Sequence, residues 1–556
     1  MAVCERLRAR FSEIIAGSPR GAATWHVLVV DGAAKMALSR LFGAADLLRL
    51  NIALIVDIDA QKQPIPDAAA IYACRPTVEN ARLLFQHIGA NFYGSYEFIS
   101  IAGPSQLHML LYQEFKGEPS RGSRLLRIVE FPMDLALITR DFFTPNGELS
   151  EERIIGTLYS YISALTGGLE SDGLERVLRM PQIYTCGPAS RTLLNTLLER
   201  LQGENVICER LPGHILVLAD READPTPLFY HPYTYQGLLE EFELFSPDDR
   251  GDPLFDQIGA LHFTRATEEV NLALRGIKER YGTEGERRHQ LGSLTFQMDE
   301  LAAQKANCEK HTDLCEKILQ RTEGMELSKL HALEQELPNG TRDVISYATS
   351  ATHTMHIVRL LICLLLTSGD NLKGLSMGTR ERLSGPVQQA AKLLDKILAQ
   401  PDAGETAQLL QDYTRLILNS IDDTSIDSPD QLSLNTALAA TVNFVRKGIN
   451  ALTNRGQSLA HAFVDLVTKG EAGPLYNTAY DFQTQEGTGT GVITNVGLFI
   501  HGLGSLEEAA RISEGISLAF EGTANAPAFS YGCISLKQGS VENIIRKSIR
   551  IAERHL

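Results

Sequence analysis

Short apolar runs alternate with amphipathic stretches over the first 130 residues of the chain. The runs fall at 27–30, 52–58, 69–73 and 98–102, and helical patterns lie between them. Alternation of this kind is typical of βα units, in which buried strands of a parallel sheet are joined by helices that cover its faces. The pattern therefore predicts an α/β region built on a parallel sheet.

A second α/β stretch covers about 131–248. Strands are predicted near 135–138 and 215–218, with helices at 151–165 and 191–201. From 256 to about 469 the composition shifts to Leu, Ala, Glu, Lys and Gln with a 3.6-residue period, which predicts an all-helical region. Residues that end helices interrupt this period at Pro338, Gly340, Gly385 and Pro401.

Strand character returns after the helical region. The pattern predicts a strand at 492–500, a helix at 505–518, a strand at 528–536 and a helix at 541–554. One such unit is too small to cover its strands on both faces, so we expect it to complete the second α/β region across the helical one. The predicted domains are 1–130, 131–248 together with 485–556, and a helical domain, 249–484, inserted into the second.

Composition narrows the function classes. The 556 residues carry 52 basic and 68 acidic side chains, a formal charge of -16, which argues against binding nucleic acid. The eight cysteines include no C-x-x-C pair, so we expect reduced thiols in a cytosolic protein. The longest apolar run, 360–366, is far shorter than a membrane span, and the first residues lack the pattern of a signal peptide.

Three groups of residues could bind a ligand or act in catalysis, and each could instead have a purely structural role. The segment 502–505 could bind phosphate or form a tight turn, although the chain lacks a G-x-x-x-x-G-K-[ST] loop. His353 and His356 have a spacing that suits a metal or a polar helix face. Asp220 and Asp224 could form an acid/base pair or, beside Arg221, a charge-satisfied turn. The structural alternative is favoured in each case, and no catalytic residue, metal or cofactor is predicted.

The most informative segment runs from Asp220 to Gln236, here called the signature segment. It follows the apolar run 215–218, contains Pro225 and Pro227, which stop a strand, and enters a helical pattern at Thr234. Its order, D-R-x-x-D-x-x-P-L-x-x-H-x-x-T-Y-Q, resembles a signature of the SM family, the Sec/Munc-type SNARE-binding proteins.

Further matches occur in the order that the family has. They are Trp25 to Asp31, Asp46 to Leu48, Pro64 to Pro66, Ala70 to Tyr72, Pro76 to Asn80, Gly502 with Gly504 and Glu507, and Tyr531 to Cys533. The stretch from Lys447 to Phe482 looks most like the branch that acts between the ER and the Golgi. The resemblance implies a three-domain arch of two α/β domains with parallel-type sheets and a large inserted helical domain.

Two binding sites are implied by the resemblance. A pocket in the first domain would capture the N-terminal peptide of a syntaxin-type SNARE, and local alignment places it on Leu107, Leu110, Leu111, Leu125 and Ile128. A helical hairpin near 291–320 would act as a template for SNARE helices, with Met298, Leu301, Lys305 and His311. The chain departs from the family at Asp299, where Pro is common, so a bend at that position is in question.

The function implied is that of a monomeric SM protein that templates SNARE assembly for vesicle docking and fusion in ER-to-Golgi or intra-Golgi transport. Expected partners are a syntaxin-type Qa-SNARE and the assembled SNARE bundle, with an R-SNARE, tethers and Rab proteins as further candidates. We expect a cytoplasmic protein held on ER, Golgi or vesicle membranes through its partners. Two alternatives stay open: an SM protein of the vacuolar or endosomal branch, and an α/β enzyme with a helical lid.

Overall fold

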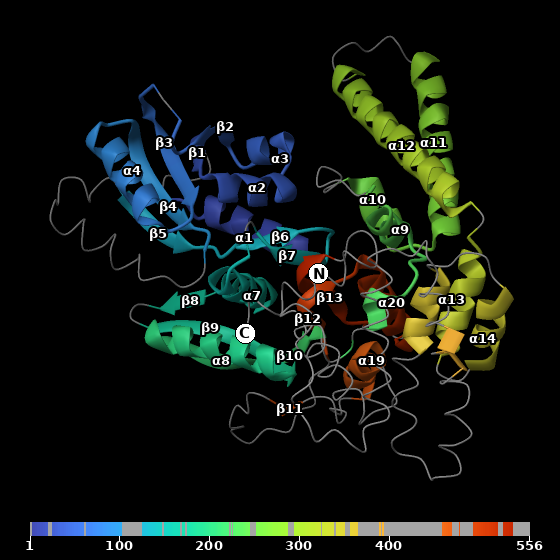
Figure 1. Ribbon diagram of the computed structural model, residues 1–556. Helices are drawn as coiled ribbons and strands as arrows, with labels where there is room; N and C mark the ends of the chain where they lie inside the picture. Colours follow the sequence, from blue (N-terminus) through green and yellow to red (C-terminus); the bar gives the residue numbers. More distant parts are fainter. Residues whose placement is uncertain are drawn as a thin grey trace, which may run out of the picture. The chain divides into compact units, whose positions relative to one another are not determined.

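The chain forms two compact units in the computed structural model (Figure 1). The first comprises residues 1–218, 476–499 and 520–535, and the second comprises 219–475, 500–519 and 536–556. The structure describes residues 3–19, 25–60, 63–102, 125–146, 149–166, 169–172, 175–221, 224, 226–244, 252–286, 294–323, 325–337, 341–350, 356–364, 389–390, 392–393, 459–469, 477–478, 493–520 and 526–536.

A five-stranded parallel sheet opens the first unit (Figure 1). Its strand order is β2-β1-β3-β4-β5, and each neighbouring pair is parallel. In chain order the elements are α1 (Val3–Ala16), β1 (His26–Val30), α2 (Gly32–Leu41), α3 (Ala44–Arg49), β2 (Ile52–Asp57), β3 (Ile65–Cys74), α4 (Val78–Gly89), β4 (Tyr93–Ser100) and β5 (Leu125–Glu130).

Helices cover both faces of this sheet because side chains alternate along each buried strand. Leu28 and Val30 of β1 belong to the apolar cluster that includes α1 and α2, whereas Val27 and Val29 belong to the cluster that includes α4. Asp31 then caps α2 by accepting a hydrogen bond from the amide of Ala34 at 2.8 Å. The apolar run at 27–30 is therefore a buried strand that leads into a capped helix.

The second sheet has eight strands in the order β11-β9-β10-β12-β13-β7-β6, with β8 paired to β9. Its elements are β6 (Leu135–Leu137), β7 (Phe142–Pro145), α7 (Glu151–Thr166), β8 (Leu169–Asp172), β9 (Glu175–Cys186), α8 (Pro188–Gly203), β10 (Val206–Asp220), β11 (Asn477–Thr478), β12 (Asn495–Gly504) and β13 (Ala528–Leu536). Strands from before and after the helical region therefore share one sheet, as the sequence predicts.

The second unit is mainly helical. It contains η2 (Thr226–Leu228), α9 (Tyr235–Glu241), α10 (Pro253–Ile258), α11 (Phe263–Glu286), α12 (Leu294–Thr322), α13 (Leu327–Gln335), α14 (Thr341–Ser350), a helical stretch at 356–364, α19 (Leu459–Lys469) and α20 (Leu506–Ala519). Helices α11 and α12 pack along each other as a hairpin (Figure 1). α13 ends at Gln335 and α14 begins at Thr341; the predicted helix-ending residues Pro338 and Gly340 lie between them in the sequence, outside the described residues.

The predicted fold class, α/β plus all-α, is confirmed. The second sheet adds antiparallel pairs that the pattern did not indicate: β6 with β7, β8 with β9, and β11 with β9. Strands joined by only a few residues have no room for a crossover helix and must pair antiparallel, which explains the first two. The boundaries of the three predicted domains stay a prediction, and the predicted helix at 541–554 lies outside the described residues.

The observed bounds of some strands differ from the predicted bounds. The structure starts β10 at Val206, nine residues before the apolar run at 215–218, because all residues of its first part except Val206 are exposed or half-buried and give no apolar run. It also places β4 at Tyr93–Ser100 rather than at 98–102. β5, β7, β8, β9 and β11 have no counterpart among the predicted strands. β5 is half-buried, and β7, β8 and β11 are four residues long or shorter, so their hydrophobic signal is weak. β9 is longer, but Arg179, Pro181 and Gln182 interrupt its apolar residues.

Candidate functional site

The signature segment begins where β10 ends, and its first basic residue is buried. Arg221 is 2% exposed; its Nε donates to the carbonyl of Leu503 at 2.8 Å and its Nη1 to the carbonyl of Asp224 at 2.9 Å. The same guanidinium forms an ion pair with Glu508. Asp224 in turn accepts from the amides of Thr226 and Leu459. These contacts support the interpretation of Asp220 to Asp224 as a charge-satisfied turn.

Gly502 shows why the following strand needs glycine at this point. Its φ is +146°, and a Cβ added there would lie 2.6 Å from Cβ of Arg221. Both the backbone conformation and the close approach therefore exclude a side chain. Gly502 to Gly504 are the last residues of β12, packed closely against Arg221, and they do not form the predicted tight turn.

The protein's own carboxylates occupy the start of α20. Glu240 accepts from the amide of Leu506 at 3.1 Å and from Oγ of Ser505 at 3.4 Å. A negative group at a helix N-terminus is stabilised by the backbone amides there, which is the role a bound phosphate would otherwise take. The arrangement therefore argues against the phosphate alternative at 502–505.

Glu507 ties the signature segment to α20. Its Oε2 accepts from the amides of Tyr233 and Thr234 at 3.1 and 3.0 Å and from Oγ1 of Thr234 at 2.7 Å, while Oε1 accepts from Nε of Arg511 at 2.9 Å. Burial opposes the charge, but Arg511 and the Thr234 donors outweigh it and lower the pKa of Glu507. A Cβ at Gly237 would lie 2.7 Å from Oε2, so this residue must also be small.

A buried chain of carboxylate and imidazole groups lies beside Glu507. Both oxygens of Glu334 accept from the amide of His231, and Nδ1 of His231 lies 2.6 Å from Glu334 Oε1. Nε2 of His231 lies 3.0 Å from Nδ1 of His356. Burial and Arg359 lower the pKa of His231, whereas His231 and Arg511 overcome burial and lower that of Glu334.

These contacts bear on the metal alternative. His356 faces another imidazole, and His353 lies outside the described residues. Within the part of the chain that the structure describes, no group of three potential ligands is placed to hold a metal ion. The network instead joins the signature segment to α13, the stretch 356–364, α19 and α20, so its evident role is structural.

Sequence reasoning missed most of the partners in this network, including Glu240, Glu334, Arg359 and Glu508. Arg359 donates to the carbonyls of Phe229 and Tyr230 and pairs with Glu241. A signal was present in only one case: Glu507 and Arg511 have the i, i+4 spacing of a helical ion pair. The other partners come from distant helices, and nothing local marks them.

The α11–α12 hairpin is the second candidate site, and the signature segment contacts the middle of α12. Oη of Tyr235 lies 2.8 Å from Nδ1 of His311, whose Nε2 lies 2.9 Å from Oδ2 of Asp252. His311 is 0% exposed. It therefore anchors α12 from inside and does not present its side chain on the surface of the hairpin.

The other predicted template residues lie along α12. Lys305 is exposed and pairs with Glu309 at 3.5 Å. Met298 and Leu301 are on the helix, but their side chains are outside the described set. Asp299 also lies within α12, so the position where the family often has Pro is helical in this chain. Direct contact of these residues with a partner stays a prediction.

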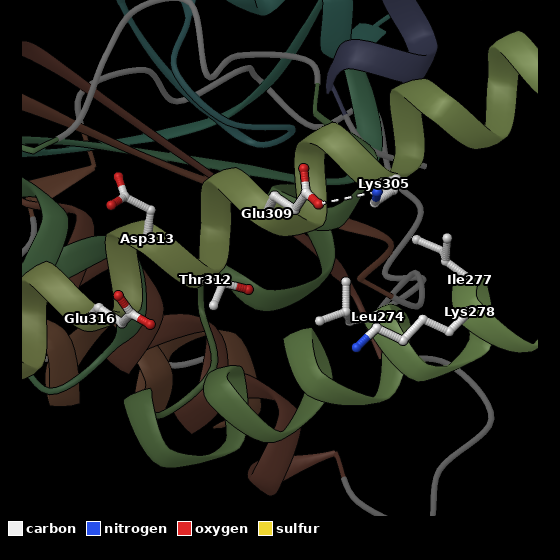
Figure 2. Close-up of a pocket in the computed structure, with 8 residues that line it drawn as sticks. All are labelled: Leu274, Ile277, Lys278, Lys305, Glu309, Thr312, Asp313 and Glu316. Carbon is white, nitrogen blue, oxygen red and sulfur yellow. Dashed lines mark ion pairs between the residues drawn. The ribbon is translucent and has the colours of Figure 1, made fainter.

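A groove of about 570 Å³ runs between α11 and α12 (Figure 2). Leu274 and Ile277 of α11 supply its apolar part. Charged side chains of both helices line the remainder: Lys278, Lys305, Glu309, Asp313 and Glu316, together with Thr312. Sequence reasoning missed Leu274 and Ile277, although their i, i+3 spacing on one helix was a usable signal.

The predicted peptide pocket of the first unit is described only in part. Leu107, Leu110 and Leu111 lie outside the described residues, whereas Leu125 and Ile128 are half-buried on β5. These two are three residues apart, yet both pack against the cluster on the α4 side of the sheet. The reason is an irregularity in the pairing of β4 with β5, where Tyr96 faces Leu125 but Glu97 faces Arg127. The extra residue shifts the alternation and brings Leu125 and Ile128 to one face.

The sequence profile of the Sec1 family matches residues 26–461, which is most of the chain. The chain therefore belongs to the Sec1 family. Protein sly1 of Schizosaccharomyces pombe is 24% identical over 230 residues, which are 39% of this chain and 36% of that protein. The SEC1 family transport protein SLY1 of Oryza sativa is 22% identical over 382 residues, 59% of this chain and 60% of that protein.

Solved structures show the same fold over the full length. Sly1p in complex with an N-terminal peptide of Sed5p superimposes with a TM-score of 0.65 at 15% identity, covering 100% of this chain and 99% of that one. The SM protein Vps45 gives 0.61 at 14% identity, covering 100% and 98%. The curated sequence relatives are sly1 proteins, which supports the predicted ER-to-Golgi branch. Among the described residues, none of the helices is long and apolar enough to cross a membrane.

Proposed function

We propose that this chain binds SNARE proteins and templates the assembly of SNARE complexes for vesicle docking and fusion between the ER and the Golgi. The observation that carries the proposal is the likeness over the full length to Sly1p, a Sec1-type protein solved with an N-terminal peptide of Sed5p. Vps45, a second protein with this fold, was solved with the Qa SNARE Tlg2. A syntaxin-type Qa-SNARE is therefore the proposed partner.

The proposal assigns two separate tasks to two surfaces. The first unit would hold the N-terminal peptide on Leu107, Leu110, Leu111, Leu125 and Ile128. Burial of one apolar anchor side chain in such a pocket contributes about 1.5 to 3 kcal/mol. The hairpin of the second unit would align SNARE helices along α12 through Met298, Leu301 and Lys305, with His311 as its internal support.

The physical benefit of a template is entropic. Two disordered segments must lose conformational freedom and find the same register before they can zip together. A surface that holds one of them as a helix removes part of this cost in advance, as preorganisation does in other associations. Binding, and not bond chemistry, is therefore the proposed activity.

The test of the peptide pocket is a pulldown from cytosol and detergent-solubilised membranes with identification by mass spectrometry. The intact chain should recover a syntaxin-type SNARE, and Leu110→Arg should not. A matched control is Leu126→Arg, since Leu126 is the irregular residue of β5 and is already 37% exposed. Equal recovery by the intact chain and the Leu110→Arg chain would remove the pocket from the proposal while leaving SNARE binding in place.

The hairpin is tested separately with Leu301→Asp, which should slow SNARE assembly while peptide capture is unchanged. Loss of both together would contradict the assignment of two sites. The alternative of an α/β enzyme predicts a nucleotide or a metal in the purified protein, which denaturing extraction and elemental analysis would detect. In the cell, we propose that the protein is held on ER, Golgi or vesicle membranes by its SNARE partners, which fractionation after removal of the SNARE would test.

A further inference from the structure

Tyr233 of the signature segment lies between two histidines from different parts of the second unit. Its ring stacks on that of His331 in α13, with ring centroids 4.3 Å apart and an interplanar angle of 3°. The ring of His262, which directly precedes α11, meets Tyr233 edge-on at 3.7 Å. The amide of Phe263, the first residue of α11, donates to the carbonyl of Tyr233 at 3.1 Å. The three rings, here called the histidine clasp, therefore hold the start of α11 beside the signature segment.

His262 also caps α11. Its carbonyl accepts from the amide of Ala266 at 2.9 Å, which is the first backbone bond of the helix, and its Nδ1 accepts from the amide of Thr264 at 3.2 Å. The first amides of a helix lack partners within the helix, so a side chain that accepts from one of them stabilises the first turn. An amide can only donate. Nδ1 of His262 must therefore carry no proton in this contact.

His331 faces a donor in the same way. Nη2 of Arg511 lies 3.3 Å from Nδ1 of His331, and a guanidinium has donors but no acceptor. Nδ1 of His331 must therefore accept, and the proton of the neutral ring belongs on Nε2, which lies 2.9 Å from the side-chain amide of Gln335. A half-turn of a Gln amide exchanges its nitrogen and oxygen, so this amide can accept that proton. Both histidines of the clasp thus need an unprotonated Nδ1.

His231 and His311 differ from this pair because they face carboxylates. Nδ1 of His231 lies 2.6 Å from Glu334, and Nε2 of His311 lies 2.9 Å from Asp252. A carboxylate accepts from an imidazole N–H whether the ring is neutral or charged. Protonation therefore breaks contacts of the histidine clasp but leaves these two carboxylate contacts in place.

The charged groups around the clasp do not overcome its burial. Burial lowers the pKa of His262, although Glu507 and Glu514 of α20 favour its protonated form. Burial and Arg511 lower the pKa of His331. The other charged groups that act on His331 are Glu507, Glu334 and His262. Because the fold holds both rings neutral, the closed clasp is present above about pH 6.5 and is lost as the pH falls below it.

We propose that the histidine clasp is a pH-sensitive hinge, which fixes the first turn of α11 to the signature segment at neutral pH and releases it in acid. Protonation of Nδ1 of His262 removes the acceptor for Thr264. It also places a positive charge at the N-terminus of α11, where the helix dipole is already positive. Protonation of His331 sets two cations, its own ring and Arg511, against each other.

The release is confined to the start of α11. Val270, one turn further along, belongs with Leu314 and Ile318 of α12 to an apolar cluster. These three side chains carry no titrating group, so their packing does not change with pH. The inference concerns α11 itself and holds whether or not the chain binds SNARE proteins.

Hydrogen exchange of the full chain, followed by mass spectrometry at pH 7, 6 and 5, tests the hinge. Exchange is expressed relative to the intrinsic rate at each pH, because that rate itself changes with pH. Protection of the amides of Phe263, Thr264 and Ala266 should fall about tenfold between pH 7 and pH 5, as expected for the loss of one cap and the gain of one unfavourable charge at a helix end. Protection of residues 308–318 of α12 should change little.

Three variants separate titration from packing. In the double variant His262→Asn with His331→Gln, side-chain oxygens replace both Nδ1 acceptors and do not titrate, so protection at pH 5 should equal that at pH 7. His262→Arg is charged at every pH and should lower protection already at pH 7. His214→Asn is the control, because His214 is in the first unit and its Nδ1 lies beside the carbonyl of Pro212. It should leave the pH response of α11 unchanged.

The proposal is overturned if the start of α11 shows no pH response, if the double variant keeps the response of the intact chain, or if His262→Arg is protected like the intact chain at pH 7. It is also overturned if α12 loses protection at the same pH as the start of α11. That result would mean that acid unfolds the unit as a whole and that the clasp is not a hinge.

Discussion

The hydroxyl of Tyr235 lies 2.8 Å from Nδ1 of His311, and this contact connects the signature segment to the middle of α12. The sequence places these residues in separate motifs, 76 positions apart. Through this contact the signature segment supports α12 of the proposed template hairpin.

Tyr235→Phe removes only this hydroxyl and leaves a buried imidazole nitrogen without its partner. We expect the second unit to lose about 1 to 3 kcal/mol of stability. The only Trp, Trp25, is in the first unit, so hydrogen exchange of α12 is a better measure than fluorescence. Tyr233→Phe is the control, because its hydroxyl contacts Ser328 at the surface and its loss should change little. Equal exchange in both variants would contradict the anchoring role.

Removing one partner of the buried pair Arg221 and Glu508 should be severe. Both side chains are nearly inaccessible, at 2% and 3%. Arg221→Met leaves Glu508 buried with an uncompensated charge, for which about 3 to 5 kcal/mol is expected. The double variant with Glu508→Gln should be less destabilised than Arg221→Met alone. Urea unfolding followed by circular dichroism measures this, and additive losses would show that the two residues act independently.

Gly502→Ala should destabilise the protein by more than about 2 kcal/mol. The new Cβ would meet Arg221 at 2.6 Å in a backbone conformation, φ +146°, that L residues rarely adopt. Gly276→Ala is the matched control, because Gly276 is inside α11 with nothing within 4 Å of an added Cβ. That change should be neutral or stabilise by up to about 1 kcal/mol. Thermal unfolding compares the two, and a neutral Gly502→Ala would rule out the close approach.

Acid should destabilise the second unit in two steps. Burial lowers the pKa of His231, His262 and His331, so the folded state holds them neutral while the unfolded chain binds protons as the pH falls below about 6.5. The lowered pKa values of Glu334 and Glu507 add stability above about 4.5 that is lost below it.

The unfolding free energy of the unit should therefore decline from pH 7 to pH 5, by up to about 1.4 kcal/mol per pH unit for the buried His231 and by less for His262 and His331, which solvent partly screens. His331→Gln should make this decline shallower, whatever its effect at pH 7. Urea titrations at pH 7, 6 and 5 provide the measurement. A decline of the same steepness in His331→Gln would show that His331 does not contribute.

Much of the fold could be predicted because its signals are local. The runs at 27–30 and 52–58 became β1 and β2, the helix predicted at 151–165 became α7, and Thr234 caps α9 at the start of the predicted helical pattern. Strands such as β5 were not predicted, because a half-buried strand at the edge of a sheet has no clear alternation of apolar and polar residues. The Leu125 and Ile128 pair was named from resemblance alone, and only the pairing irregularity with β4 explains how the two share a face.

The sequence by itself determined the fold class, the insertion of helices between strands of one sheet, and membership of a family through an ordered set of short motifs. These follow from hydrophobic periodicity and residue order, which are properties of the chain. The tertiary structure decided what the motifs do: Arg221 and His231 are buried among partners from distant helices, and His311 anchors α12 from inside. Burial and long-range pairing depend on which segments meet in space, and no local pattern along the chain contains that information.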